Sequence, residues 1–303
     1  MKTKMSGPSV SILTSYFKGE EFLLKFLDNL VSQDMFSKLE LVLDINEPSI
    51  SELKILKEFR SQFPGVLNLS INESVVPMSV SLNNCILRAK ANYLCIWNID
   101  DRRTTNSISS QYDLISNSEK INTVYGPYVI TSDYKCDSGK LIDNSKNPDY
   151  QFTRSMLLGP FFMFRKSLIE KIGYFDEQFY SAADFDFAVR LAFIGGLKST
   201  QNLLGYFLDN QSGLSTNKNS IGPIERSIIQ LRYGIIGLFN VTYIPYIANY
   251  VIPKIKFRNE WIPIENIVQD YEKIKLREIS RTPKSNNSLA RQIIAIFRRL
   301  FSQ

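Results

Sequence analysis

The fold is decided by the stretch Val10-Ser11-Ile12-Leu13-Thr14, a short run of apolar and β-branched residues that predicts a β-strand. Residues 20–32 come next and place apolar side chains at every third or fourth position, which is the period of an amphipathic helix. The same alternation of short strands and longer helices continues over residues 39–44, 50–63, 66–71, 81–89 and 93–97. Such alternation is typical of successive βαβ units, so we predict an α/β fold with a Rossmann-like, mainly parallel central sheet flanked by helices.

Each of the predicted strands is followed by a polar loop. In open α/β sheets, ligands bind beyond the carboxyl ends of the parallel strands. We therefore expect the loops at residues 15–19, 44–49 and 98–103 to lie on one rim of the sheet and to form a ligand site there.

The next part of the chain is less regular. Its predicted elements are a strand over residues 123–130, a polar surface excursion over 131–150, a buried strand over 159–164 and a short helix over 166–172. A longer helix is predicted to begin at Asp184, a residue type that favours helix N-caps, and to end before Gly195 and Gly196.

The C-terminal third changes character and suggests three parts for the whole chain. We predict a nucleotide-binding domain over residues 1–220, a helical extension packed on it over 221–281, and a polar linker with a basic amphipathic helix over 282–303. Residues 233–253 are uncharged, but polar residues and Pro245 interrupt them, so buried or amphipathic helices broken at Pro245 are favoured over a membrane span.

The terminal helix, residues 289–301, combines a broad apolar face with three arginines elsewhere on its surface. A helix of this kind can lie in a membrane interface, or it can dock on its own domain or on a partner subunit. The N-terminus leads directly into the first strand, and we predict no export signal there.

Composition limits the chemistry that this chain can perform. The 303 residues carry a formal charge of +6 and contain no histidine. The charge favours acidic partners such as nucleotides or anionic lipid, although a solvated basic surface explains it equally well. Without histidine, acid–base chemistry near neutral pH falls mainly to carboxylates, and a hard metal ion must sit on oxygen ligands. Three widely spaced cysteines argue against a disulfide framework or a zinc site and agree with a reducing compartment, so we expect a cytoplasmic location.

The segment Trp97-Asn98-Ile99-Asp100-Asp101-Arg102-Arg103 directly follows the fourth predicted strand. Two adjacent carboxylates repel each other unless a cation compensates them, and such oxygen ligands suit Mg²⁺ or Mn²⁺, which can bridge a nucleotide diphosphate. Two other interpretations remain open: Asp101 could cap the helix near Ser107, or the carboxylates could pair with the two arginines.

A second acidic region follows about eighty residues later. Asp184 lies at the predicted start of a helix, where the helix dipole stabilises an ionised carboxylate of the kind that a general base requires. It could equally be only an N-cap. Asp186 and Arg190 lie four residues apart on the same helix, and we predict a structural ion pair between them.

Taken together in this order, these segments resemble the family 2 glycosyltransferases with the GT-A fold, over roughly residues 9–215. Residues 10–18 look like the first strand and nucleotide loop of the family, which implies donor contacts from Thr14, Ser15 and Tyr16. Asp44 resembles the acidic end of the second strand, which contacts the base or ribose, and residues 83–93 are similar to the stretch leading into the fourth strand. The resemblance thereby implies nucleotide-sugar contacts from the residues Asp44, Asn83, Asn98 and Asp100.

The resemblance also implies roles for the two acidic regions. Residues 98–101 take the place of the Asp-x-Asp metal motif, with Asp100 and Asp101 as ligands of Mn²⁺ or Mg²⁺. Ala183 and Asp184 take the place of the Glu-Asp pair whose aspartate is the base.

Four positions depart from the family pattern. Asn98 replaces the first aspartate of the metal motif, and Ala183 replaces the glutamate before the base. Leu82 stands where an arginine is common, and residues 45–48 replace a frequent Asp-Gly-Ser. The central carboxylates are all retained.

If the resemblance holds, the reaction is inverting transfer of a sugar from a nucleotide-diphosphate donor to an acceptor hydroxyl in one displacement. The acceptor would be a glycan or a lipid-linked molecule of surface polysaccharide synthesis, reached from the cytoplasm or from the inner face of the membrane through residues 289–301; no nucleic acid partner is expected. One alternative is a sugar-1-phosphate nucleotidyltransferase, whose first loop is rich in glycine and carries Arg and Lys; here residues 15–19 hold one glycine. Another is an inactive module that binds sugar nucleotides, suggested by Asn98 and Ala183.

Overall fold

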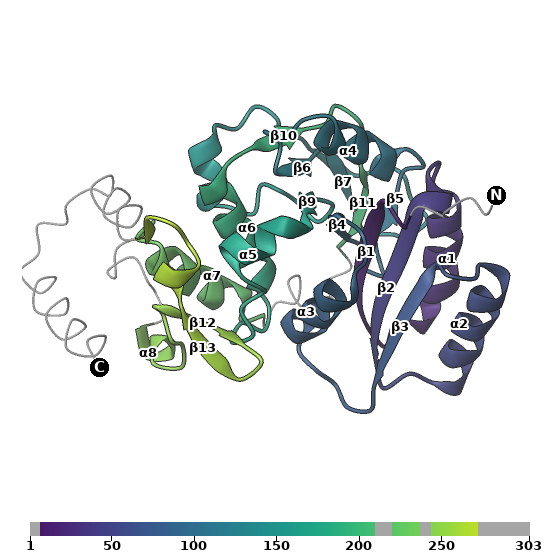
Figure 1. The fold of residues 1–303 in the computed structure, drawn as a ribbon, viewed down its shortest axis with the longest axis horizontal. Helices are drawn as coiled ribbons and strands as arrows, with labels where there is room; N and C mark the ends of the chain where they lie inside the picture. The colour runs from purple at the N-terminus through teal and green to yellow at the C-terminus, as the bar shows by residue number, and fades with distance from the viewer. Residues whose placement is uncertain (1–6, 210–219, 237–243, 272–303) are drawn as a thin grey trace, which may run out of the picture.

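The computed structural model describes residues 7–209, 220–236 and 244–271, and its centre is a seven-stranded sheet with helices on both faces (Figure 1). The strand order is β10-β6-β9-β4-β1-β2-β3. β1 pairs in parallel with β2 and β4, β2 with β3, and β6 with β10, whereas β9 runs antiparallel to both of its neighbours. The predicted α/β class with a mainly parallel central sheet is confirmed.

The first half of the sheet follows the sequence closely. Its elements are β1 (Val10–Phe17), α1 (Glu20–Val31), β2 (Leu39–Asn46), α2 (Ile50–Gln62), β3 (Leu67–Asn72), α3 (Met78–Arg88) and β4 (Tyr93–Ile96), with a 3-10 turn η1 (Phe36–Lys38) before β2. Every residue of β2 is buried, as expected for a strand covered on both faces. α2 begins where Ser49 and Glu52 form a reciprocal capping box.

Alternate residues of the strands belong to two apolar clusters, one on each face of the sheet. Ile12 of β1 packs in one cluster with α1 and α2, and its neighbour Leu13 packs in the other with α3. The first cluster also contains residues of α4 (Ser107–Ser116), and the second contains residues of α5 (Ile169–Ile172) and α6 (Ala183–Ile194). The helices therefore sandwich the sheet, as Figure 1 shows for α1 and α2 on one side and α3 on the other.

The predicted strand over residues 123–130 is wrong as a single element. It divides into β6 (Thr123–Tyr125) in the central sheet and β7 (Tyr128–Thr131) in a second sheet. Gly126 and Pro127 separate the two strands. Proline has no N–H with which to continue a ladder, and a side chain on Gly126 would come within 2.5 Å of the Thr200 methyl group, so the backbone can turn and pack closely only here.

The second sheet has the order β5-β11-β7-β8. It joins β5 (Arg102–Arg103) and β11 (Gly205–Leu208) to β7 and to β8 (Lys140–Ile142). β8 and the short helix η2 (Asp149–Thr153) show that the predicted surface excursion over residues 131–150 contains regular structure. The remaining elements of the central domain are β9 (Met163–Arg165), η3 (Lys166–Leu168) and β10 (Leu197–Ser199).

The part predicted as a helical extension also contains strands. α7 (Gly222–Arg232) and α8 (Ile244–Ile247) are followed by a hairpin of β12 (Lys254–Phe257) and β13 (Glu260–Pro263), and then by η5 (Ile264–Asn266). The hairpin turn places Arg258 and Asn259 at positive φ, the backbone shape that two-residue hairpin turns favour. Pro245 is the second residue of α8, where a proline is tolerated. The boundaries at residues 220 and 281 stay predictions.

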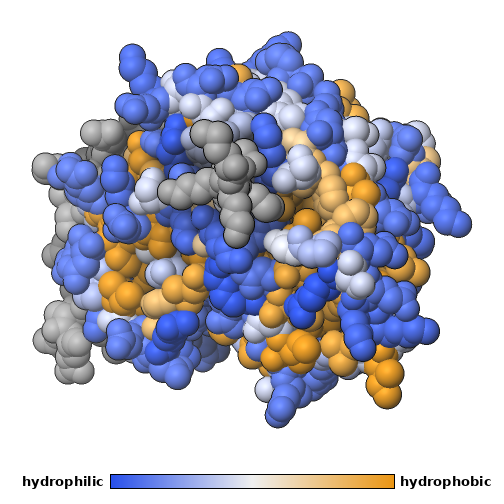
Figure 2. Space-filling view, turned by 45° about the vertical axis from the view of Figure 1, so that its right-hand side comes forward, coloured by the Kyte–Doolittle hydropathy of each residue, from blue (hydrophilic) through white to orange (hydrophobic). Residues whose placement is uncertain are grey.

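Among the described residues, none of the helices has the length and apolar character needed to cross a bilayer. Figure 2 shows hydrophilic side chains over most of the visible face, with apolar residues in separate smaller patches. The predicted amphipathic helix over residues 289–301 lies outside the described residues.

Candidate functional site

The loops after β1 and β4 meet at the carboxyl edge of the central sheet. Ser15 lies opposite Asp44 in the β1–β2 register, and Leu13 lies opposite Ile96 in the β1–β4 register. A side chain on Gly19 would lie 3.0 Å from Ile99, so the loop after β1 packs directly on the loop after β4. This arrangement confirms that the loops expected on one rim come together there.

Backbone strain marks the same rim. Lys18 after β1 and Glu47 after β2 both have positive φ, at 50° and 46°, a conformation that is uncommon for residues other than glycine. Such conformations persist only where the surroundings fix them, and they cluster at ligand sites.

The predicted donor residues of β1 differ in exposure. Thr14 is fully buried and its hydroxyl donates to the Trp97 carbonyl at 2.9 Å, which joins the ends of β1 and β4. Tyr16 is also fully buried; its hydroxyl donates to the Glu52 carboxylate, and burial raises its pKa. Ser15 is partly exposed. Of these three side chains, Ser15 is the one placed to contact a ligand, and the other two position the strand ends.

Asp44 sits at the end of β2 inside a polar network. Its carboxylate accepts from the Ser81 hydroxyl at 2.9 Å and from Arg88 at 3.4 Å, and it also accepts from the Asn72 amide. The same Asn72 amide donates to Asn46 at 3.1 Å, and Asn46 donates in turn to the Tyr16 carbonyl at 3.2 Å. The ends of β1, β2 and β3 are therefore linked through side chains. Asn46 and Asn72 were missed by sequence reasoning because neither stands in a recognisable motif.

Asn83 points to a different part of the chain. Its amide nitrogen donates to the Phe175 carbonyl at 2.9 Å and to Glu177 at 3.0 Å, and its amide oxygen accepts from the Phe175 N–H at 2.9 Å. The structure therefore joins Asn83 to the 175–177 segment, and does not bring its side chain together with the rim residues. Its predicted contact with the nucleotide-sugar stays a prediction.

The residues after β4 form a tight turn around the two aspartates. The Asp101 N–H donates to the Asn98 carbonyl at 3.2 Å, and the Trp97 indole donates to the Asp101 carbonyl at 3.0 Å. The Asp101 carboxylate is fully buried and accepts from the Leu208 N–H at 3.1 Å and from the Asn98 amide at 3.2 Å. Asp100, in contrast, is partly exposed.

The two carboxylates affect each other's protonation. Burial raises the pKa of Asp101 well above its usual range, and the neighbouring charge of Asp100 raises it further. Burial also raises the pKa of Asp100. A cation at this turn would stabilise both ionised forms, because an opposite charge nearby favours the charged state.

This turn fits a metal ion that takes most of its ligands from a substrate. Across the described ranges, no group of three or more Asp, Glu, His or Cys side chains could hold a metal ion by itself. Mg²⁺ is commonly bound through one or two carboxylates together with substrate phosphates and water. Asp100 supplies a partly exposed carboxylate of this kind, while the Asp101 carboxylate is fully buried and both of its oxygens already accept hydrogen bonds.

The arginines after the aspartates have other partners. Arg102 forms an ion pair with Asp137 at 2.8 Å, and its guanidinium lies 4.4 Å from the centre of the Tyr206 ring. Arg103 is buried and donates to Ser107 at 2.8 Å and to Gln111 at 3.0 Å. The N-cap of α4 is Asn106. Neither the helix-capping interpretation of Asp101 nor the arginine-pairing interpretation matches these contacts.

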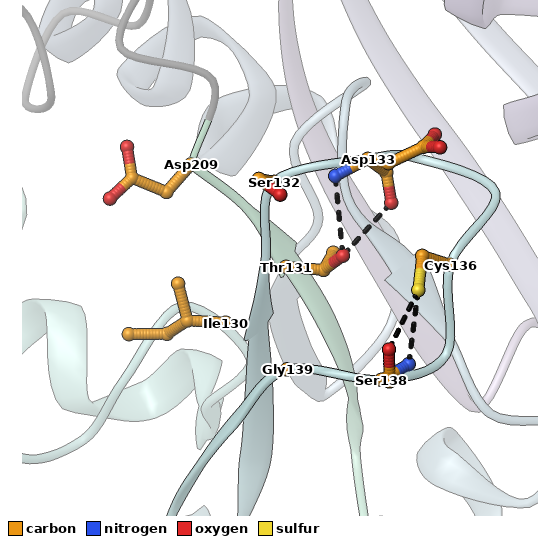
Figure 3. Close-up of a pocket in the computed structure, with 8 residues that line it drawn as sticks. All are labelled: Ile130, Thr131, Ser132, Asp133, Cys136, Ser138, Gly139 and Asp209. Carbon is orange, nitrogen blue, oxygen red and sulfur yellow. Dashed lines mark hydrogen bonds between the residues drawn. The ribbon is translucent and has the colours of Figure 1, made fainter.

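A pocket of about 470 Å³ opens at the ends of β7 and β11 (Figure 3). Asp209, which lines it, directly follows Leu208, the residue whose N–H holds Asp101. The lining residues are Ile130, Thr131, Ser132, Asp133, Cys136, Ser138, Gly139 and Asp209. The pocket is therefore joined to the turn of the two aspartates through Leu208.

The second acidic region lies at the start of α6. Ala182 is the N-cap, so the prediction that Asp184 begins the helix as its cap is wrong: Asp184 is the second residue inside it. Its carboxylate accepts from the Phe185 N–H at 2.7 Å and is partly exposed. Burial raises its pKa, outweighing that N–H bond and the nearby Arg226, both of which lower it. The Asp184 carboxyl is therefore a stronger base than an ordinary aspartate.

Asp186 and Arg190 form the predicted ion pair, at 2.7 Å and fully buried. Arg232 of α7 extends it, with ion pairs of 2.8 Å to both Asp186 and Asp176. Tyr233 adds a hydrogen bond of 2.9 Å to Asp186. The network fastens α6 and the 176 segment to α7 through buried charges.

Glu225 is a further functional candidate that sequence reasoning missed. It lies in α7 and accepts hydrogen bonds from the backbone just before α6. Glu225 and Arg232 are seven residues apart, which is about two helical turns, and Ile228 and Ile229 lie between them on the same buried face. A charged residue at an apolar-face position of a predicted helix is the signal that could have identified both.

Comparison with known proteins agrees with this architecture. No family model matches the chain. The putative glycosyltransferase EpsE of Bacillus subtilis is 26% identical over 96 residues, which is 32% of this chain and about a third, 34%, of that relative.

Two solved structures are similar in fold. S. aureus TarS 1–349 in complex with UDP-GlcNAc has a TM-score of 0.59 at 17% identity, covering 77% of this chain and 67% of that one. The mannosyltransferase PcManGT from Pyrobaculum calidifontis in complex with GDP-Man and Mn²⁺ has a TM-score of 0.53 at 14% identity, covering 99% of this chain and 82% of that one. These likenesses establish the fold.

Proposed function

We propose that this chain is an inverting glycosyltransferase with the GT-A fold, which transfers a sugar from a nucleotide-diphosphate donor to an acceptor hydroxyl. The observation that carries the proposal is the pair of partly exposed carboxylates, Asp100 after β4 and Asp184 in the first turn of α6. Further support comes from proteins of similar fold that were solved in complex with UDP-GlcNAc and GDP-Man, and from the match to EpsE.

In this proposal the donor lies at the rim where β1, β2 and β4 end. Ser15 contacts it directly, and Asp100 lies beside its diphosphate. Asp44 is fully buried, and it acts on the base or ribose side of the rim indirectly, by holding the partly exposed Asn72. Thr14 and Tyr16 fix the strand ends from inside the protein.

A divalent cation, Mn²⁺ or Mg²⁺, would be held by the partly exposed Asp100, and the buried Asp101 would support it through its charge. When bound, the cation would offset the negative charge on the departing nucleoside diphosphate. Asn98 holds the Asp101 carboxylate in place through its amide. Asn98 stands where the family has an aspartate, and in this proposal its role is to hold Asp101.

Asp184 accepts the proton of the acceptor hydroxyl as that oxygen attacks the anomeric carbon. A base works best when its pKa approaches the working pH, and burial moves the pKa of Asp184 in that direction. The buried aspartates of the α6–α7 network are ion-paired and enclosed, so they serve structure instead.

The acceptor class remains the one expected from the sequence, a glycan or lipid-linked molecule of surface polysaccharide synthesis. A peripheral contact with the inner face of the membrane through residues 289–301, and a cytoplasmic location, likewise remain predictions.

The two alternative functions make different predictions in one experiment. The full chain is incubated with UDP-, GDP-, dTDP- and CMP-linked sugars and Mn²⁺ or Mg²⁺, with and without candidate acceptors. A parallel incubation contains nucleoside triphosphates and sugar-1-phosphates in place of the linked sugars. A glycosyltransferase releases a nucleoside diphosphate from a UDP-, GDP- or dTDP-linked sugar, and CMP from a CMP-linked sugar. A nucleotidyltransferase instead forms pyrophosphate from a nucleoside triphosphate and a sugar-1-phosphate, and an inactive module binds a donor without turnover. Either of the last two outcomes overturns the proposal.

A further inference from the structure

Glu225 of α7 is a buried carboxylate that binds three consecutive backbone N–H groups. Its side chain is 1% exposed. One carboxylate oxygen accepts from Tyr180 at 2.8 Å, and the other accepts from Ser181 at 2.7 Å and from Ala182 at 2.8 Å. These donors lie 43 to 45 residues before Glu225 in the chain, so the contact is tertiary.

The three donors belong to the loop of residues 180–182, which leads into α6. Successive N–H groups that converge on one point, next to a helix N-terminus, form a site that favours an anion. The N-cap residue Ala182 has no side chain that could satisfy these groups. Glu225, which belongs to α7, therefore provides the hydrogen-bond acceptor that the residues before α6 do not provide.

The same carboxylate is itself held in place. The Tyr250 hydroxyl donates to it at 3.1 Å, and the Tyr250 ring stacks on Phe179 with the ring centres 5.6 Å apart. Arg232, seven residues along α7, lies over the Phe179 ring at 4.9 Å from the ring centre. Tyr250 and Arg232 therefore help to fix both Glu225 and the loop of residues 180–182 that it binds.

Asp184 lies two residues beyond this loop. Its position is therefore set by where the loop enters α6. Two charged neighbours in α7 also act on its carboxyl: Glu225 raises its pKa and Arg226 lowers it, in addition to the dominant effect of burial.

We propose that Glu225 is a positioning residue that holds the loop of residues 180–182 and thereby fixes where the Asp184 carboxylate meets the acceptor hydroxyl. This rests on the proposed role of Asp184 as base. The geometric part, that Glu225 anchors the loop, does not depend on that role and can be measured without any substrate.

The first test is amide hydrogen exchange in Glu225→Gln. A glutamine has one acceptor oxygen, so its NH₂ group must face at least one of the three backbone donors. We expect exchange at residues 180–182 to become about 10-fold faster or more, the effect of losing charge-assisted hydrogen bonds. Glu170→Gln, at an exposed position of α5, is the matched control and leaves exchange there unchanged. Exchange in Glu225→Gln equal to wild type overturns the proposal.

The second test is the pH profile of turnover. Misplacing the base lowers kcat by about 10- to 100-fold while KM for the donor stays near wild type. Removing the negative charge of Glu225 also lowers the pKa of Asp184, so the acidic limb of the profile moves to lower pH. Arg226→Gln removes the opposing positive charge and moves the same limb to higher pH. A purely structural lesion cannot produce shifts of opposite sign at neighbouring positions.

The outcomes separate this inference from the proposed function. If wild type releases no nucleoside diphosphate from any donor, the proposed function fails, and the hydrogen-exchange result still decides whether Glu225 holds the loop. If wild type is active and Asp184→Asn is not, but Glu225→Gln keeps the wild-type kcat and acidic limb, the positioning role is overturned and the proposed function stands.

Discussion

Asp101 and Asp184 lie in two acidic regions that are held in place by different means. The turn around Asp101 is fixed mostly by its own neighbours, Trp97 and Asn98, with one added contact from Leu208 of β11. The loop before Asp184 has no side-chain cap of its own and depends on Glu225 and Arg232, both in α7. One region is thus largely built by local sequence, and the other by a distant helix.

This difference predicts that the two regions fail independently. A change in α7 should disturb the base and leave the metal turn intact, and a change in the turn should do the reverse.

Asp184→Asn should lower kcat by about 10² to 10⁴-fold, because an amide cannot take up the proton of the acceptor. The asparagine oxygen can still accept from the Phe185 N–H, so the helix should be retained. Donor binding, measured by calorimetry, should stay near wild type. Asp113→Asn, at an exposed position of α4, is the control, and near-normal turnover in Asp184→Asn would contradict the assignment.

Arg232→Met should lower the free energy of unfolding by about 3–5 kcal/mol, because it leaves the buried carboxylates of Asp176 and Asp186 without a shared partner. Chemical denaturation measures this loss, and Arg226→Met, at an exposed position of the same helix, should change stability by less than about 0.5 kcal/mol. Under conditions where Arg232→Met remains folded, metal-dependent nucleotide binding should persist. Loss of that binding together with stability would show that the two regions are coupled.

Asp100→Ala should lower kcat by about 10² to 10³-fold, as expected when a group that stabilises transition-state charge is removed. Nucleotide binding should become insensitive to EDTA, whereas EDTA should weaken binding in wild type. Amide exchange at residues 180–182 should not change, because the turn and the loop have separate supports. Binding titrations that respond equally to EDTA in wild type and variant would argue against Asp100 as a metal ligand.

The smallest effect concerns the pH dependence of stability. Burial raises the pKa of Asp184 in the folded state, so ionising it opposes folding. The cost is absent below the pKa of the unfolded state and appears as pH rises through the folded-state pKa. Wild type should therefore lose stability relative to Asp184→Asn between acidic and neutral pH. Denaturation midpoints that differ by the same amount at both pH values would refute the raised pKa.

Sequence alone determined the elements whose signals are local. The alternation up to residue 97 specified β1 to β4 and their helices, because apolar periodicity encodes which face of each element is buried. The acidic positions also followed from sequence, since Asp100 and Asp101 lie in the loop after the buried strand β4. The ion pair between Asp186 and Arg190 could be predicted because helical geometry fixes their separation.

The tertiary structure decided what depends on contacts between distant residues. Asn83 bonds to Phe175, 92 residues away, and Glu225 bonds to Tyr180, 45 residues away. It also divided the strand at Gly126, placed a hairpin after α8 and made Ala182 the cap in place of Asp184. The physical reason is that apolar periodicity shows which face of a helix or strand is buried, but does not show which other part of the chain covers that face. A buried carboxylate such as Glu225 is stabilised only by donors that the folded chain brings to it.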